Sequence, residues 1–449
     1  MLISKKINMK NIVYKVFLFC TVIAFTSCEL QEIDNPNAPS VESFEEGASQ
    51  ADVQLLATGL EAVMRNDLAF HYDTESILAR EYYDLTGVDP RYTGELLKGP
   101  LDNNGFLTTR SFAAWFKGVK SANILITAVE NSQAGFDDAT KNSYYGFAKT
   151  MQAYSFMMVA NRQFENGIRM DVSDPDNLGP ILGYTEALAG IQALLTEGLA
   201  NLNNSSDSFD FPISSGFAGF DTPASFVQFN RAVAARVALY QGNNTQVLQF
   251  LGNSFFDLGG DLNNGPAHVF GLTGNDIANV QFHVPNQSGQ EFMIHDSWIA
   301  DAEAGDSRVT NKSNLFTIDD VPTTVTFDGL SADYQIALYD SNTDPVYLIR
   351  NEELILMYAE AQIDVNPALT VTAIDVIRNA AGIGNYTGAT DATSLIEEIL
   401  TQRRYSLLAE GHRWVDLRRL GRLNATYIPL DRSGDNIINA FPTPFNEGL

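Results

Sequence analysis

Apolar residues recur at three- and four-residue spacings along most of the chain, and this spacing places them on one face of an α-helix. The pattern predicts helices at about 51–64, 110–131, 138–161, 184–203, 222–242, 244–257, 347–361, 374–381 and 395–408. Gly411 stops or bends the last of these. Beyond it, Trp414 and Leu417 lie three residues apart, as expected of a short second helix that packs against the first.

Two stretches lack the helical period. Residues 65–106 are rich in Tyr, Asp, Arg and Gly, and residues 258–345 contain glycines, asparagines and short β-like runs such as 321–327. The first stretch is expected to be a long irregular loop. A loop of that length inside a compact domain is more often functional than idle.

Successive amphipathic helices with small residues at their crossings, such as Ala148, Ala153, Ala232 and Ala235, predict a stack of helical pairs. The expected fold class is therefore mainly α, with a tetratricopeptide-like scaffold, long irregular loops and a little β. The scaffold is expected at about 50–257 and 345–420, and a loop-rich insert at about 258–345.

The N-terminus has the pattern of a signal peptide. Four lysines precede an apolar run at 16–25, which is too short to span a bilayer as a helix. The following Thr-Ser-Cys resembles the end of a bacterial lipobox, so residues 1–27 are expected to be removed and Cys28 to be lipidated. The alternative is an ordinary secretory signal with an incidental cysteine. Residues 28–45 are acidic and proline-bearing, as in a flexible tether, and 46–449 are expected to form one domain.

Composition narrows the class of protein further. The 449 residues are 45% apolar and 18% charged, as in folded globular proteins. The net charge of −27 argues against nucleic acid and against anionic lipid headgroups as partners. Cys20 and Cys28 are the only cysteines, so the chain beyond Cys28 can form neither a disulfide bond nor a thiolate metal site.

The stretch 402–419 holds five of the 28 Lys and Arg residues. Arginines on a buried helix flank need acceptors, and the nearest in sequence are Glu410 and Asp416. We interpret Glu410, His412, Arg413 and Asp416 as a buried polar clasp that joins two helices. An acid-base site is the alternative, but no partner nucleophile or metal-ligand spacing lies nearby.

The same stretch resembles a known family. Glu410-Gly411-His412-Arg413-Trp414, followed by Asp416-Leu417-Arg418-Arg419, is similar to the C-terminal signature of the SusD/RagB family, the surface lipoproteins of Bacteroidetes polysaccharide-utilisation systems. The segments 226–240, 347–361 and 441–447 also resemble family segments. Gln402 and Ser406 stand where the family usually has Glu, so part of its customary charge pairing is missing.

The resemblance implies a function in nutrient uptake. Members are lipid-anchored on the cell surface of the outer membrane, where they capture oligosaccharides without catalysis. They deliver these ligands to a TonB-dependent transporter of the SusC type. Some members bind peptides instead, and a peptide ligand stays open for this chain.

Enzyme and metal motifs are absent from the sequence, and no catalytic residue, metal or cofactor is predicted. The five histidines show no metal-ligand spacing, and no nucleophile elbow, P-loop or dinucleotide fingerprint occurs. Residues 340–344 alternate like a calcium loop, but Pro345 stands where that loop needs glycine. A secreted glycan hydrolase on a helical scaffold stays the alternative, because the spacing of a carboxylate pair is a property of the fold.

A neutral sugar site needs flat aromatic faces surrounded by planar polar groups, and the loop regions offer both. The predicted stacking residues are Trp298, Tyr82, Tyr83 and Tyr92, and the predicted hydrogen-bonding residues are Arg80, Asp84, Asp89 and Arg91. The competing interpretation is that the three tyrosines pack the loop against the scaffold. Trp115 shares a helical face with Val119 and Ala122 and is assigned to the core.

Overall fold

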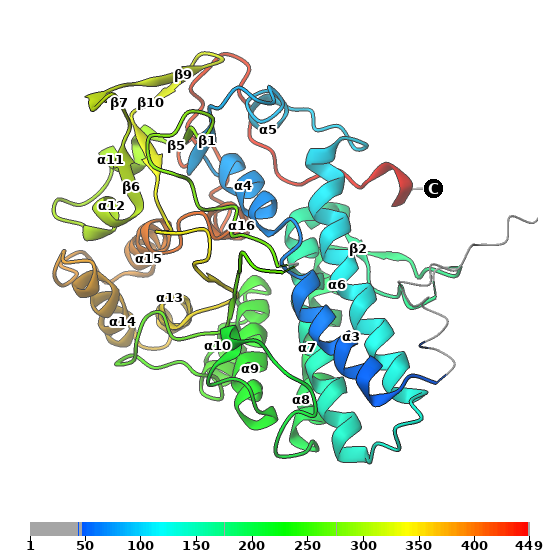
Figure 1. Cartoon of the computed structure of the whole chain (residues 1–449). Helices are drawn as coiled ribbons and strands as arrows, with labels where there is room; N and C mark the ends of the chain where they lie inside the picture. The colour runs from blue at the N-terminus through cyan, green and yellow to red at the C-terminus, as the bar shows by residue number, and fades with distance from the viewer. Residues whose placement is uncertain (1–43, 45–46, 175, 275, 448–449) are drawn as a thin grey trace, which may run out of the picture. The chain divides into compact units, whose positions relative to one another are not determined.

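Helices are the main regular element among the described residues, as the apolar pattern predicts (Figure 1). The computed structural model describes residues 44, 47–174, 176–274 and 276–447. The predicted signal peptide, Cys28 and nearly all of the predicted tether lie outside the described residues. The helices are α3 (Gln50–Val63), α4 (Leu68–Leu78), α5 (Glu95–Lys98), α6 (Phe106–Glu130), α7 (Asp138–Gln163), α8 (Tyr184–Asn203), α9 (Pro223–Tyr240), α10 (Asn244–Leu251), α11 (Asp296–Ala300), α12 (Ser307–Lys312), α13 (Asn351–Gln362), α14 (Pro367–Ala380), α15 (Ala392–Ser406) and α16 (His412–Arg419).

Most helices pack against a neighbour in sequence, and the expected mainly α fold with stacked helical pairs is confirmed. Helix α3 packs on α6, α6 on α7, α7 on α8, α8 on α9 and α9 on α10. Figure 1 shows α3, α6, α7 and α8 side by side. The stack continues from α10 to α13, which packs against both α14 and α15. Within the described ranges, none of these helices combines the length and the apolar character that crossing a membrane requires.

Small residues bring the helices of the stack close together. A Cβ atom on Gly146 of α7 would lie 2.6 Å from the Leu202 side chain and 3.1 Å from the Gly198 carbonyl oxygen of α8. Only glycine therefore permits this approach. The predicted crossing residues Ala148, Ala153, Ala232 and Ala235 are all fully buried.

Side-chain caps fix where several helices begin. Thr222 and Ser225 form a capping box at the start of α9, and Pro223 occupies the first turn, where a missing N–H costs nothing. Asp137 accepts a hydrogen bond from the Thr140 amide at 2.8 Å and so caps α7. Such caps satisfy backbone donors that the first helical turn leaves open.

Helix α4 corrects the expectation that residues 65–106 are irregular. Ten of its eleven residues are buried, and the polar residues His71, Thr74 and Glu75 are among them. A helix that is covered on all sides needs no polar face, so its sequence shows no amphipathic period. Helix α10 also ends at Leu251, well before the predicted residue 257.

The strands are short and lie mostly in the predicted loop-rich insert. They are β1 (Tyr82–Asp84), β2 (Ile168–Arg169), β3 (Ile181–Leu182), β4 (Ala267–His268), β5 (Phe292–Ile294), β6 (Ser313–Leu315), β7 (Thr317–Ile318), β8 (Val321–Pro322), β9 (Val325–Phe327), β10 (Leu330–Ala332), β11 (Tyr334–Ile336) and β12 (Val346–Tyr347). One antiparallel sheet has the order β1-β5-β11-β6, with Tyr83 opposite Met293 and Met293 opposite Gln335. This pairing fixes the segment after α4 against the insert.

The last two helices form the predicted pair, and Asp416 is held as the predicted clasp requires. Helix α15 ends at Ser406, and Gly411 begins α16 with φ of 75°, a left-handed conformation that favours glycine. The Arg403 Nε donates to Asp416 Oδ2 at 2.6 Å, and the Arg419 Nε donates to Asp416 Oδ1 at 2.9 Å. Burial alone would raise the pKa of Asp416, but the two guanidinium groups lower it to about 2.

Trp414 lies in the core, where the sequence places it. Its side chain is buried, its Nε1 donates to the Ile438 carbonyl oxygen at 2.8 Å, and its ring meets Phe441 edge-on at 5.8 Å between centroids. Arg413 donates to the Tyr427 carbonyl oxygen at 3.1 Å. Both side chains therefore join α16 to the chain that follows it.

Trp414→Ala is expected to lower the free energy of unfolding by about 3–5 kcal/mol, because the indole leaves a cavity that the packed helices cannot close. Thermal unfolding followed by circular dichroism measures the change in midpoint. Trp414→Phe is the comparison variant, since it keeps a six-membered ring in the core and loses the five-membered ring with its Nε1 hydrogen bond, so its midpoint should fall less. A midpoint unchanged in Trp414→Ala would contradict the structural role.

Candidate functional site

Trp298 lies in the core and not on a loop surface. It belongs to α11, its side chain is 0% exposed, and its Nε1 donates to the Arg404 carbonyl oxygen at 3.3 Å. Its ring packs on Tyr405 at 5.0 Å between centroids. An indole without an exposed face cannot stack on a sugar ring in this conformation, so the geometry gives Trp298 a packing role.

Tyr82, Tyr83 and Arg80 are also buried, in line with the competing interpretation that this segment packs against the scaffold. The Tyr82 hydroxyl donates to Asp73 Oδ1 at 2.6 Å, and the Tyr83 hydroxyl donates to Asp431. The Arg80 guanidinium donates to the carbonyl oxygens of Leu97 and Asn436 at 3.1 and 3.0 Å. Both tyrosine hydroxyls and both terminal nitrogens of Arg80 thus form hydrogen bonds within the protein.

The other predicted polar residues lie nearer the surface. Asp84, at the end of β1, accepts hydrogen bonds from the amide and the hydroxyl of Thr86 at 3.0 and 2.6 Å. Asp89 and Arg91 form an ion pair at 2.6 Å, and the Arg91 guanidinium lies 4.2 Å from the centre of the Phe106 ring. Contact between these three residues and a ligand remains a prediction.

Tyr92 is the predicted residue that lines an open cavity, whose volume is about 710 Å³. The cavity lies between the turn from α3 into α4, one face of α6, and the segment 270–281 that precedes β5. Its lining includes Arg65, Asn66, Asp67, Phe70, Asp73, Tyr92, Arg110, Lys117, Phe270, Ile277, Val280 and Gln281. Three segments that are distant in the sequence thus build one site.

Aromatic rings and planar charged groups alternate along this cavity. Tyr92 meets Phe70 edge-on at 6.4 Å between centroids, and the Arg110 guanidinium lies 4.6 Å from the centre of the Phe70 ring. The Arg65 guanidinium lies 5.9 Å from the Phe270 ring. A sugar has apolar C–H faces beside hydroxyl groups, and this mixture of flat apolar and polar groups suits both.

Ion pairs hold the walls of the cavity in place. Asp67 adopts φ of 53°, which is uncommon for a residue with a side chain, and it makes no side-chain cap on α4. Its carboxylate accepts instead from the Arg110 Nε at 2.7 Å. The Arg65 Nη1 donates to Asp276 and to the Val269 carbonyl oxygen, both at 2.6 Å, and so ties the segment 270–281 to the end of α3.

Asp73 is the cavity residue with the most altered ionisation. Burial raises its pKa to about 7, although the hydrogen bond from Tyr82 acts in the opposite direction. At neutral pH this carboxyl group is therefore partly protonated, and the cavity loses part of its negative charge.

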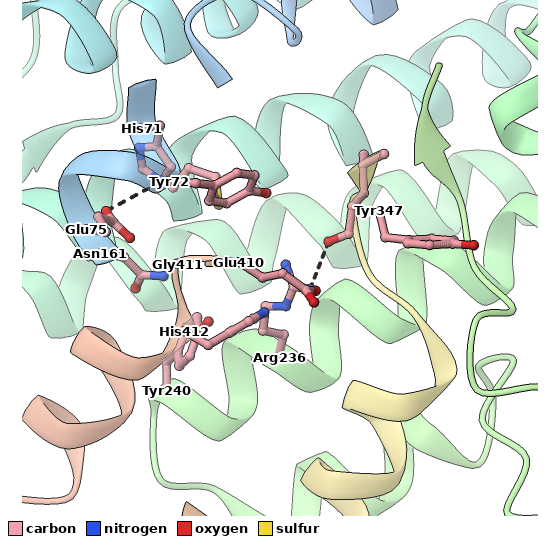
Figure 2. Close-up of a pocket in the computed structure, with 12 residues that line it drawn as sticks. His71, Tyr72, Glu75, Asn161, Arg236, Tyr240, Tyr347, Glu410, Gly411 and His412 are labelled. Carbon is pink, nitrogen blue, oxygen red and sulfur yellow. Dashed lines mark hydrogen bonds and ion pairs between the residues drawn. The ribbon is translucent and has the colours of Figure 1, made fainter. Parts of the chain in front are cut away.

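A second, enclosed cavity lies at the C-terminal signature (Figure 2). His71, Tyr72 and Glu75 of α4 line it together with Glu410, Gly411 and His412, and its volume is about 10 Å³. That volume suffices for one water molecule and excludes a sugar. The signature residues therefore line a small polar cavity in the interior, which cannot hold a sugar ligand.

Burial controls the ionisation of the groups around the enclosed cavity. The Trp115 Nε1 donates to His71 Nδ1 at 3.2 Å, and His71 Nε2 lies 3.4 Å from Glu75 Oε1. Burial holds the pKa of His71 well below its ordinary value and raises the pKa of Glu75 to about 8. Burial also lowers the pKa of His412 to about 4. At neutral pH both histidines are neutral, and Glu75 is mostly protonated.

Metal binding finds no support in the geometry. Across the described ranges, no group of three or more His, Cys, Asp or Glu side chains is placed to hold a metal ion. In the segment that alternates like a calcium loop, the Asp344 carboxylate accepts from the amides of Asp340 and Ser341 at 2.7 and 3.0 Å. These bonds form a turn within the segment.

Solved structures share this fold at low sequence identity. A SusD superfamily protein from Parabacteroides distasonis superposes with a TM-score of 0.63 at 15% identity, covering 87% of this chain and 96% of that chain. NanU from B. fragilis gives 0.60 at 16% identity, covering 89% and 94%. A laminarin-binding SusD-like protein gives 0.55 at 17% identity, covering 88% and 96%. The curated proteins contain no match to the sequence.

Sequence comparison agrees with the fold, because residues 321–446 match the sequence model of the SusD family. In this range the chain resembles the SusD family in sequence, and the described chain shares the fold of SusD-like structures. The matched range contains α13 to α16 and the buried ion pairs of α15 and α16. The shared sequence pattern therefore belongs to the scaffold, and the open cavity lies outside the matched range, apart from Val346.

Several cavity residues were missed by sequence reasoning. They are Arg65, Asp67, Phe70, Arg110, Lys117 and Phe270. Arg65-Asn66-Asp67 follows directly after a predicted helix, and this run of polar residues could have indicated a candidate site. Arg110 and Lys117 lie seven residues apart, two helical turns, and so share one face of α6. Nothing in the sequence, however, connects these positions with Phe270.

Glu75 is expected to reduce the stability of the protein at alkaline pH. Its pKa is raised from 4.5 to about 8, so the folded state binds the proton more tightly than the unfolded chain. The resulting stability is fully present below about pH 4.5 and is lost as the pH rises through about 8. In the Glu75→Gln variant the free energy of unfolding should fall less steeply with pH, by about 1.4 kcal/mol per pH unit, between about pH 4.5 and about pH 8.

Chemical unfolding of both proteins at about pH 6 and about pH 9 measures this difference. Asp73 and Glu81, whose pKa values burial raises to about 7, remain in both proteins, so the difference in slope isolates Glu75. Equal slopes in the two proteins would contradict the prediction.

Proposed function

We propose that this protein is a non-catalytic binding protein of the SusD/RagB family on the cell surface, which captures oligosaccharide and delivers it to a SusC-like TonB-dependent transporter in the outer membrane. The observation that carries the proposal is the open cavity of about 710 Å³ with Tyr92, Phe70 and Phe270 in its lining. This volume falls in the ordinary range of ligand sites. The solved laminarin-binding SusD-like protein of the same fold supports a glycan ligand.

The aromatic residues argue for sugar over peptide. A peptide held in extended form needs a row of open backbone groups at a sheet edge or a long apolar groove. The cavity instead offers separate ring faces beside guanidinium and carboxyl groups, without a strand in its lining apart from Val346 at the start of β12. Tyr92 is the stacking residue we assign, with Phe70 and Phe270 as further apolar surface.

A glycan hydrolase is the second candidate function, and one observation favours it. Asp67 and Asp73 both line the cavity, and the pKa of Asp73, raised by burial to about 7, would suit a general acid. Two contacts weigh against it, because Arg110 neutralises Asp67 and the Tyr82 hydroxyl occupies Asp73 Oδ1. New reducing ends after incubation with the bound oligosaccharide would support the hydrolase.

The anchor is part of the proposal. Residues 1–27 act as a signal peptide, Cys28 carries the lipid, and residues 28–45 link the lipid to the domain. A single acyl chain gives only marginal membrane binding, so the multiply acylated cysteine of lipoproteins is required.

Tyr92→Ala is expected to weaken oligosaccharide binding about fivefold to tenfold, because it removes the ring face against which the sugar packs. Calorimetry with a panel of plant and marine oligosaccharides measures the affinity. Tyr386→Ala, at a partly buried tyrosine outside the cavity lining, is the matched control. Trp298→Ala should instead lower the unfolding midpoint. Equal affinities of Tyr92→Ala and the unaltered protein would place the site elsewhere.

Cys28→Ala is expected to abolish fatty-acid labelling and to release the protein from the membrane fraction. Labelling of cells with a radioactive or clickable fatty acid measures this directly. Cys20→Ala is the matched control, because Cys20 lies inside the apolar run and should leave labelling intact. Equal labelling of Cys28→Ala and the unaltered protein would refute the lipid anchor.

A further inference from the structure

Basic side chains gather at the open cavity of an acidic protein. The whole protein carries a net charge of −27, yet Arg65, Arg110 and Lys117 all line the cavity. The acids there are Asp67 and Asp73 in the lining and Asp276, which pairs with Arg65, and Asp73 is partly protonated at neutral pH. A cavity that gathers positive charge on an acidic protein focuses the field on a bound anion.

Arg110 and Lys117 project from the same face of α6 and keep donors available. The Arg110 side chain is 50% exposed, and its bonds to Asp67 use Nε and Nη2. Lys117 is exposed, and across the described ranges it forms neither an ion pair nor a hydrogen bond with another side chain. A lysine that served only to fix the cavity wall would have a partner there, as Arg110 does.

Arg65 brings the third positive charge from the opposite wall. Its side chain is only 17% exposed, and both hydrogen bonds that it makes among the described residues use Nη1. The guanidinium carbon lies 5.9 Å from the centre of the Phe270 ring. Guanidinium forks match the geometry of carboxylate and of sulfate-like oxyanions, and the aromatic rings beside them suit a sugar ring.

We propose that the ligand of the open cavity is an acidic oligosaccharide, whose carboxylate or sulfate group is held by Arg65, Arg110 and Lys117 while its ring packs against Tyr92 and Phe270. This inference rests on the proposed capture of oligosaccharide and names the class of sugar. A neutral glycan could accept hydrogen bonds from these side chains, but it would leave the positive charge of Lys117 without an anionic partner. An acidic one uses the charge and the aromatic faces together.

The test is calorimetry of the mature protein with oligosaccharides matched in length: oligogalacturonides and alginate oligosaccharides for the carboxylate, carrageenan oligosaccharides for the sulfate, and neutral β-glucan and galactan oligosaccharides. At least one acidic class should bind about tenfold or more tightly than the neutral ones, and this advantage should shrink as salt is added. The class that binds distinguishes carboxylate from sulfate.

Lys117→Gln should weaken binding of the acidic oligosaccharide about twofold to fivefold, the range for a charge pair that stays partly in water. Lys120→Gln is the matched control, because Lys120 is an exposed lysine of the same helix outside the cavity lining. An equal loss of affinity in both variants would show that the effect comes from the overall charge of the protein, and it would overturn the proposal.

The remaining outcomes separate this inference from the proposed function. Neutral and acidic oligosaccharides that bind equally, with Tyr92→Ala weakening both, would overturn the acidic ligand and leave oligosaccharide capture intact. Failure of every oligosaccharide to bind to the folded protein would overturn both. Acidic binding that is lost in Lys117→Gln and Tyr92→Ala but kept in Lys120→Gln would support both.

Discussion

Buried ion pairs between helices that are distant in the sequence hold this scaffold together. Arg236 of α9 pairs with Glu353 of α13, and Arg419 of α16 donates to Glu360 of α13 while it shares Asp416 with Arg403. Removing such charges from water is expensive, and the cost is offset only when every partner is present. The pairs therefore permit one relative placement of α9, α13, α15 and α16. Helix α4 packs on α16, so the wall of the open cavity that α4 provides depends on the same placement.

The sequence predicts those parts of the fold in which one helix face is apolar and the other is polar. Helix α8 spans Tyr184–Asn203, the range that its periodicity predicts, and the pair α15 and α16 follows from residues 395–419. Helix α4 escapes prediction because tertiary packing covers it on all sides, and polar residues such as His71 and Thr74 form hydrogen bonds inside the protein. An amphipathic period in the sequence indicates a helix with one face exposed to solvent, and a fully buried helix does not show this period.

The candidate site was less predictable, because exposure and proximity both arise from tertiary structure. Tyr92 was placed in the site on composition alone, and it lines the cavity. Trp298 has the same local surroundings of glycine and polar residues, yet α15 covers its ring through Tyr405. The basic residues were missed because they are distant in the sequence from the rest of the site. Arg65, Lys117 and the segment 270–281 line one cavity only once the helices have stacked.

The link between Arg65 and Asp276 divides the protein into parts with different tolerance to change. The segment 270–281 forms one wall of the cavity, contains no helix or strand among its described residues, and is tied to the end of α3 by that ion pair. The charged helices that stabilise the fold lie elsewhere. Ile277 and Val280 are exposed, so substitutions there can alter the surface of the cavity while the folding free energy changes little, whereas Asn279 and Gln281 are buried. A new ligand specificity is thus accessible by mutation of one surface segment, without a compensating change in the helical stack.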